Sequence, residues 1–241
     1  MTWHQQPLAG IDLETTGTAP EGDRIVTAAV VRYGGGRPTE TSSWIADPGV
    51  PIPPGATAVH GFTTEAVRAA GRPAPAVVGE VVDAVASLVS EGLPLVVMNA
   101  PFDLTMLEHE AQRHGMRGLF DRTVPHVLDP QVLDKRVDRY RRGGRRLTDL
   151  CRHYVVPLDA AHDSTADAIA ACGVTWKLAN RHRWLARMPL AELHEQQARW
   201  SADQQESLRA HFEATPGKEH RAATVRTDWP VIPPMRPGAW G

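Results

Sequence analysis

The sequence predicts an α/β fold with a mixed central sheet, and three observations lead to that class. Short apolar runs, bounded by turn residues, alternate with segments whose apolar residues recur at helical spacing. The first three runs follow one another with only short turns between them, which indicates an antiparallel meander. The later runs are separated by whole helices, which is typical of strands reached through helical crossovers.

The apolar runs define the expected strands. They cover residues 8–13, 24–31, 39–45, 95–98 and 124–128, with a glycine turn at 34–36 between the second and the third. Residues 47–54 hold four prolines, so we expect a loop without regular structure there. Helices are expected at 64–70, 75–92, 101–115, from 130 onward, at 147–154 and at 164–178.

The character of the chain changes near residue 180. Residues 190–212 are rich in Glu, Gln and Arg with few apolar anchors, which favours a peripheral helix, and residues 215–241 form a mostly irregular tail with five prolines and two tryptophans. We therefore expect a main domain at residues 1–180 and a C-terminal extension at 181–241.

Composition limits the classes of function. A net charge of −2 argues against a polycation that coats nucleic acid, so any nucleic-acid contact must come from a local basic patch, such as residues 139–146. Two isolated cysteines, Cys151 and Cys172, favour a reducing compartment and most simply belong to the core. The first residues do not resemble a signal peptide, and no apolar run is long enough to span a membrane. We therefore expect a cytoplasmic protein.

Two acidic residues stand on one face of the first strand. Alternate side chains of a strand share a face, so Asp12 and Glu14 point the same way. Their like charges repel unless a cation lies between them, and hard carboxylate oxygens suit Mg²⁺ or Mn²⁺. For this pair alone, the alternative is a solvated strand end without function.

Three further residues extend this pattern. Asp103 lies in the first turn of the helix that follows the strand at 95–98, and Asp167 lies one turn into the helix that begins near Ser164. Sites in α/β proteins assemble where strands end and helices begin. Two divalent ions would resolve the repulsion of four acids and suit phosphodiester hydrolysis. His162 lies on the loop before Asp167, where a histidine can take a proton from water. Taken singly, Asp103 could be an acidic residue that the helix dipole favours in the first turn, and His162 could be an ordinary loop residue.

These motifs together resemble the DEDDh-type 3′–5′ exonucleases, the family of the proofreading exonuclease subunit of bacterial replicative polymerase, within the ribonuclease H-like fold. The resemblance spans residues 8–178 and rests on three motifs at 11–17, 99–103 and 162–167, supported by a loop at 60–63. Met98 departs from the family, which often has histidine there, without touching the acidic positions.

The resemblance implies a role for each residue. Asp12, Glu14 and Asp167 would hold the metal that activates water, and Asp12 would bridge to a second metal with help from Asp103. His162 would be the general base. Substrate contacts are implied for the threonines after the first motif and for the 60–63 and 99–103 segments: Thr15, Thr16, His60, Phe62, Asn99 and Phe102.

The implied activity is removal of nucleoside 5′-monophosphates from the 3′ end of single-stranded or frayed DNA, as in proofreading or repair, with two Mg²⁺ or Mn²⁺ ions. We further expect Arg141 and Arg142 of the basic run to contact backbone phosphates. Two alternatives remain: the same chemistry on RNA, and an inactive member that serves as a binding module. The extension keeps a polymerase or another protein partner open.

Overall fold

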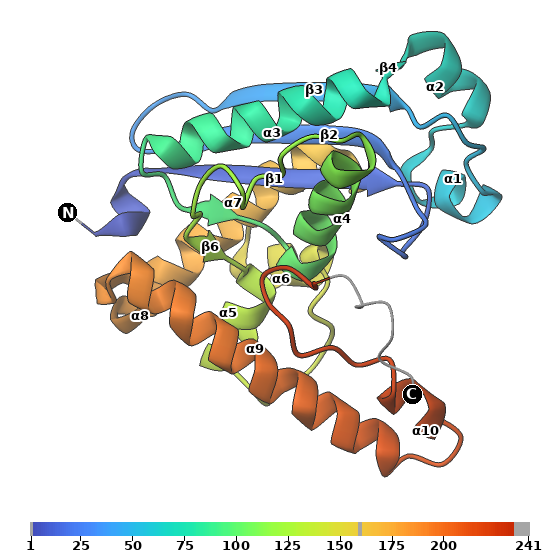
Figure 1. Cartoon of the computed structure of the whole chain (residues 1–241). Helices are drawn as coiled ribbons and strands as arrows, with labels where there is room; N and C mark the ends of the chain where they lie inside the picture. Colours follow the sequence, from blue (N-terminus) through green and yellow to red (C-terminus); the bar gives the residue numbers. More distant parts are fainter. Residues whose placement is uncertain (1, 159–160, 234–241) are drawn as a thin grey trace.

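The structure, a computed structural model, describes residues 2–158 and 161–233. Within them, a six-stranded mixed sheet of order β4-β3-β2-β1-β5-β6 forms the centre of the molecule (Figure 1). The α/β class with an antiparallel meander and added parallel strands is therefore confirmed.

The strands pair as the sequence predicts, although the later ones are shorter. β1 lies antiparallel to β2, and β2 antiparallel to β3, while β5 and β6 extend the sheet in parallel on the other side of β1. Their bounds are β1 Pro7–Thr15, β2 Ile25–Gly34, β3 Glu40–Asp47, β4 Arg72–Pro73, β5 Leu95–Val96 and β6 Val127–Leu128. The two-residue strand β4, which pairs with β3, was not predicted from the sequence.

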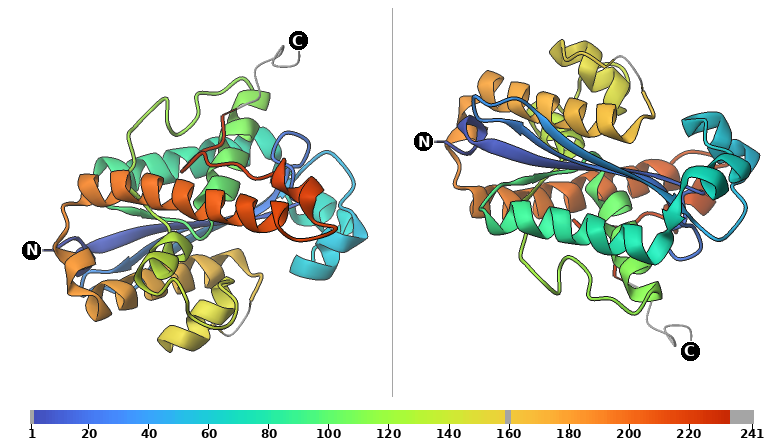
Figure 2. Two further views of the ribbon diagram at one scale, coloured as in Figure 1. Left: turned by 90° about the horizontal axis from the view of Figure 1, so that it is seen from below. Right: turned by 90° about the horizontal axis from the view of Figure 1, so that it is seen from above.

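Helices cover both faces of the sheet. α3, α4 and α9 lie on one face, and α6 and α7 lie on the other (Figure 2). A 3-10 turn, η1, spans Trp3–Gln5. The helices are α1 Pro54–His60, α2 Thr64–Ala70, α3 Ala74–Ser90, α4 Ala100–Arg113, α5 Pro130–Val137, α6 Leu147–Tyr154, α7 Ser164–Arg181, α8 Arg183–Arg187, α9 Leu190–Glu213 and α10 Glu219–Ala222.

Gly10 lets α7 approach β1 closely. A Cβ atom at this position would come within 2.6 Å of the Cys172 sulfur and 2.8 Å of a Val31 methyl group. Only glycine tolerates that spacing without a shift of the helix or the strand. The first turn of α7, with its acidic residue, is thereby held against the strand that carries Asp12.

The loop expected at 47–54 is confirmed for residues 48–53, and helix α1, which was not predicted, follows it. The helix begins at Pro54 and ends at His60, and the left-handed backbone of Gly61 (φ 81°) caps it. Proline in the first turn and glycine just after the end are ordinary helix boundaries, so the signal was present but was hidden by the prolines before it. α1 brings His60 to the carboxyl end of β1.

The C-terminal extension belongs to the same hydrophobic core as the rest of the chain. Leu185, Leu193, Trp200 and Trp229 join the core cluster that includes the sheet. Gln197 of α9 is fully buried: it accepts a hydrogen bond from the Asp129 amide and donates one to a backbone oxygen of β6. The helix expected at 190–212 is therefore confirmed, but one of its faces is internal rather than peripheral. A domain boundary near residue 180 remains a prediction.

Two expectations from composition concern the core and the membrane. Cys151 and Cys172 are free and buried, as expected of core residues. Among the helices at residues 2–158 and 161–233, none combines the length and the hydropathy needed to cross a membrane. Part of the predicted irregular tail, residues 234–241, lies outside the described residues.

Candidate active site

The centre of the site is the carboxyl end of β1. Asp12 pairs in register with Ala29 and Glu14 with Thr27, and both acidic side chains leave the strand on the same face. Ile11 and Leu13 point the opposite way and are buried in the core. A β-bulge between Glu14 and Thr15 then ends the regular pairing. The two carboxylates thus lie on a strand that is paired on both sides over part of its length.

Asp103 is fixed beside them by the backbone of β1. β5 pairs with β1 only as far as Gly10, so the amide of Leu13 has no strand partner on that side. Asp103 Oδ1 accepts a hydrogen bond from this amide at 3.0 Å. Asp103 is 4% exposed and lies in the first turn of α4. The residue before this helix, Asn99, has a left-handed backbone conformation (φ 58°). The turn between β5 and α4 therefore aims Asp103 at the strand.

Asp167 and His162 arrive together at the start of α7. Asp163 caps this helix by accepting a hydrogen bond from the Ala166 amide at 2.9 Å. His162 has a positive φ of 69°, which turns its amide back toward the helix, where it donates to Asp167 Oδ2 at 3.1 Å. Glu14, His162 and Asp167 each present a ligand atom within 4.8 Å of the others. The imidazole itself is exposed to solvent.

Burial and like charge raise the pKa values of all four carboxyl groups. Burial raises the pKa of Asp12 well above its ordinary value, and the charges of Asp103 and Asp167 raise it further. The pKa of Glu14 is raised to about 7, first by burial and then by Asp167 and Asp163. Burial is also the main cause of the raised pKa values of Asp103 and Asp167. Without a counter-charge, Glu14 is therefore partly protonated near neutral pH, and ionisation of the other three carboxyl groups is disfavoured.

The donor set fits divalent metal ions. Four carboxylates supply only hard oxygen ligands, which Mg²⁺ and Mn²⁺ prefer. Asp167 Oδ1 is buried and has no hydrogen-bond partner among the described residues, which leaves it available as a ligand. The raised pKa values also indicate a cation site, because a bound cation would favour the ionised carboxylates that burial and like charge disfavour.

A hollow of about 520 Å³ opens next to the acids. Thr15, Thr16, His60 and Phe102 line it, as expected for residues near a terminal nucleotide. The two threonine hydroxyls are used within the turn, where Thr15 donates to the Gly17 carbonyl and Thr16 donates to Asp23. Their backbone and methyl groups therefore form the wall. Further lining comes from β1 and the turn after it, and from α1 and the residue before it, which sequence reasoning missed: Pro53, Gly55, Ala56 and Val59.

His60 is poised at the wall of this hollow. Its Nδ1 accepts a hydrogen bond from the Phe62 amide at 3.1 Å, while its buried Nε2 has no partner among the described residues. Burial lowers the pKa of His60, the backbone of Thr15 raises it and the charge of His162 lowers it again. A neutral imidazole with one unpaired nitrogen suits contact with an uncharged part of a nucleotide.

Two other expected substrate contacts lie elsewhere. Phe62 packs next to the small cluster of Val26, Ile52 and Val67 and is not part of the wall of the hollow. Its structural role is to support His60, whose ring centroid lies 5.8 Å from that of Phe62. Asn99 faces a second, neighbouring hollow instead.

Asp129, directly before Pro130, has a structural role. Its carboxylate caps α5 by accepting hydrogen bonds from the Gln131 and Val132 amides. The same group also binds the amides of Asn99 and Ala100, which anchors the turn that carries Asp103. Burial raises the pKa of Asp129 to about 6, although these backbone hydrogen bonds oppose the shift.

The basic run differs from the expectation at Arg141. The Arg141 guanidinium is mostly buried and pairs at 2.9 Å with Asp134, a fully buried carboxylate that also binds Arg145 and the Tyr154 hydroxyl. These bonds hold the loop to α5, because the buried carboxylate needs its partners. Arg142 is exposed, so it remains the better candidate for a phosphate contact, and that role stays a prediction.

This strand order, with helices on both faces of the sheet, matches the ribonuclease H-like fold of solved exonuclease structures. The chain belongs to the exonuclease family RNase_T, whose sequence model, described as "Exonuclease", matches residues 9–175. The resemblance drawn from the three motifs is thereby confirmed.

Two kinds of relatives accompany this match. A DNA polymerase III subunit epsilon-like protein of Rhodobacter capsulatus is 38% identical over 165 residues, which are 66% of this chain and 22% of that protein. The chain thus matches about a fifth of that relative's length.

Solved structures share the fold. Escherichia coli exonuclease I in complex with a dT13 oligonucleotide matches with a TM-score of 0.63 and 21% identity, over 75% of this chain and 42% of that chain. Exonuclease I from Methylocaldum szegediense matches with a TM-score of 0.61 and 20% identity, over 73% of this chain and 41% of that chain. The chain spans less than half the length of these structures.

Proposed function

We propose that the protein is a divalent-metal-dependent 3′–5′ exonuclease that releases nucleoside 5′-monophosphates from single-stranded or frayed DNA. The observation that carries the proposal is the convergence of Asp12, Glu14, Asp103 and Asp167 beside His162, next to a hollow of nucleotide size. Membership of the exonuclease family supports the same chemistry.

Each residue has a defined task in this proposal. Two Mg²⁺ or Mn²⁺ ions, when bound, supply the positive charge that stabilises the attacking and leaving oxygens of an in-line displacement. Asp12, Glu14 and Asp167 would hold one ion, and Asp12 with Asp103 the other. His162 takes the proton from the water whose oxygen bonds to the terminal phosphorus. The bond from that phosphorus to the 3′ oxygen of the preceding nucleotide breaks, and that oxygen takes a proton from solvent water. His60 and Phe102 keep the departing nucleotide in place.

The choice of DNA rests on the Rhodobacter relative, whose name refers to a DNA polymerase subunit. Association with a polymerase or another protein through residues 181–241 also remains a proposal. Because α9 buries Leu193, Gln197 and Trp200 against the main domain, such a partner would meet the outer face of that helix.

A cleavage assay tests the proposal. The protein is incubated with 5′-labelled single-stranded DNA and with RNA of the same sequence, in Mg²⁺, Mn²⁺ or chelator. A ladder that shortens by single nucleotides on DNA, and disappears with chelator, supports the proposal. Preferred cleavage of RNA would instead support a 3′–5′ exoribonuclease, since the 2′-hydroxyl is what distinguishes RNA from DNA. No cleavage under any condition would leave only the inactive binding module.

A further inference from the structure

A second hollow of about 360 Å³ adjoins the candidate active site. Phe102 and Thr18 line both hollows, so the two are neighbours. Part of the lining is formed by Thr18 and Pro20 of the β1–β2 loop, by Asn99 before α4 and by Pro101 in its first turn. The rest of the lining comes from the C-terminal extension and includes Phe212, Arg221, Val225, Arg226, Asp228 and Ile232.

The extension is placed firmly enough to build a site. The chain after α10 returns to α4, where the Ile232 amide donates a hydrogen bond to the Thr105 hydroxyl at 2.9 Å. Arg209 of α9 donates to the Val225 carbonyl at 3.1 Å, which ties the returning segment to the helix. Figures 1 and 2 show α10, α1 and the carboxyl end of β1 at the same end of the molecule. The second hollow thus has fixed walls at the end of the sheet where the acids lie.

The lining combines an aromatic face with cations. The Arg221 guanidinium carbon lies 4.5 Å from the centre of the Phe212 ring, and Arg221 is exposed. Arg226 is already held by Asp228 at 3.0 Å, so Arg221 is the cation better placed to meet a phosphate. Aromatic rings and arginine planes that stack bases, together with cations that meet the backbone, are the usual means of binding single-stranded nucleic acid. The volume also falls within the roughly 300–1,000 Å³ of small-molecule sites.

We propose that this second hollow, which we call the extension groove, binds the nucleotides that precede the 3′-terminal one in a single-stranded substrate. The inference rests on the proposed exonuclease function. Phe212, braced by Arg221, stacks against a base, and Arg221 meets a backbone phosphate. Phe102 separates the terminal nucleotide in the first hollow from its neighbours in the extension groove. The groove therefore favours long single strands over short ones. The lining that it takes from the extension lies outside the segment matched by the family, residues 9–175.

Hydrolysis rates on two substrate lengths test the groove. The proposal predicts that Phe212→Leu and Arg221→Glu each raise the KM for a twelve-residue oligothymidylate by about fivefold or more. For Phe212, about fivefold is the low end of what one lost base stack is worth. Hydrolysis of the 5′-p-nitrophenyl ester of thymidine 5′-monophosphate, which has no nucleotide before the terminal one and so cannot reach the groove, should change less than about twofold. Added salt should weaken the binding of the Arg221→Glu variant less steeply, because one phosphate contact is lost.

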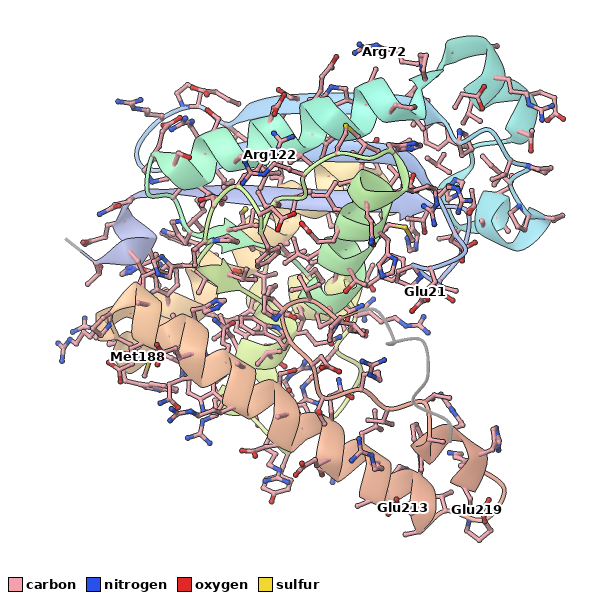
Figure 3. All side chains as sticks on the ribbon, in the orientation of Figure 1. Glu21, Arg72, Arg122, Met188, Glu213 and Glu219 are labelled. Carbon is pink, nitrogen blue, oxygen red and sulfur yellow. The ribbon has the colours of Figure 1, made fainter. Side chains whose placement is uncertain are left out.

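Arg187→Glu is the matched control for charge. Arg187 is exposed at the other end of the extension, next to Met188, which Figure 3 shows far from Glu213 and Glu219 at the α10 end. Equal KM values for wild type and both groove variants on the long substrate would overturn the groove and leave the exonuclease proposal standing. A KM increase of the same size in Arg187→Glu would also overturn it, since net charge would then explain the effect. A wild-type protein that hydrolyses neither substrate would overturn the proposed function, and the groove with it.

Discussion

The carboxylate of Asp103 accepts a hydrogen bond from the backbone amide of Leu13 at 3.0 Å, between the positions of Asp12 and Glu14 on β1. Because β5 stops pairing at Gly10, this amide is left for a side chain to satisfy. One bond therefore joins the start of α4 to the strand that carries the other two acids. This position also places the negative charge of Asp103 in a buried site beside other carboxylates. A bound metal ion would compensate the repulsion between these charges.

Replacing Asp103 by Asn separates these two effects. The amide oxygen still accepts from Leu13, but the negative charge is lost, so activity should fall by roughly 10²–10³-fold, the scale of one preorganised electrostatic group. In chelator the variant should be at least as stable as wild type, since burial and like charge raise the pKa of Asp103. Thermal unfolding checks this, and about 1 kcal/mol of relief corresponds to a gain of roughly 2–4 °C. A clear loss of melting temperature would show that the charge itself is structural.

The pH dependence of stability should reverse its sign when metal is added. In chelator, Glu14 has a pKa of about 7, raised above its ordinary value, and the other three acids are raised as well. A raised pKa means that the folded state binds more protons than the unfolded chain, so stability is lost as pH rises through about 7. With Mg²⁺ the ionised acids are paired, and stability should rise over the same interval. Unfolding curves at pH 5.5 to 8 with and without Mg²⁺ measure both slopes, and identical slopes would contradict the account.

Gly10→Ala should disturb the candidate active site by changing the packing of α7 against β1. The added methyl group would meet the Cys172 sulfur and a Val31 methyl group at less than 3 Å, so α7 must move away from β1. Overpacking of this kind costs about 1–3 kcal/mol of unfolding free energy. Activity should fall further than stability explains, because Asp167 moves relative to Asp12. The control is Gly79→Ala in α3, whose methyl group would meet Met116 at 3.5 Å and which should be neutral or stabilising.

Gln197→Ala tests whether the extension and the main domain form one folding unit. Both ends of this buried side chain bond to the backbone around β6, at Asp129 and Val127. Truncation leaves buried groups unpaired, at a cost of about 1–3 kcal/mol each. Denaturant unfolding should remain a single transition with a lower midpoint, while Gln196→Ala, one residue earlier on a less buried face, should change little. Two separate transitions would instead support independent units divided near residue 180.

The sequence predicts most of the fold because its apolar residues recur at regular strand or helix spacing. The strands β1 to β3 and the helices α3 and α7 follow directly from alternation and helical spacing, and three motifs in order are enough to place five residues at one site. What could not be predicted depends on polar side chains whose burial leaves no periodic signal. Gln197 resembles any surface glutamine of a long helix. Arg141 resembles a free cation until the fold brings Asp134 beneath it.

The groove shows the same limit from the functional side. Phe212 and Arg221 lie more than a hundred residues after Phe102, and no spacing in the sequence connects them. Only the return of the chain from α10 to α4 brings the three residues to one hollow.

Comparison of wild type with Asp12→Asn tests the central claim most directly. The rate of nucleoside 5′-monophosphate release from a 3′-labelled DNA single strand is measured in Mg²⁺, with Asp163→Asn as control, since asparagine keeps the α7 cap while one nearby charge is lost. The account predicts release by wild type, a loss of about 10³-fold or more in Asp12→Asn, equivalent to about 4 kcal/mol of transition-state stabilisation, and less than about tenfold in the control. Comparable rates for Asp12→Asn and wild type would contradict it.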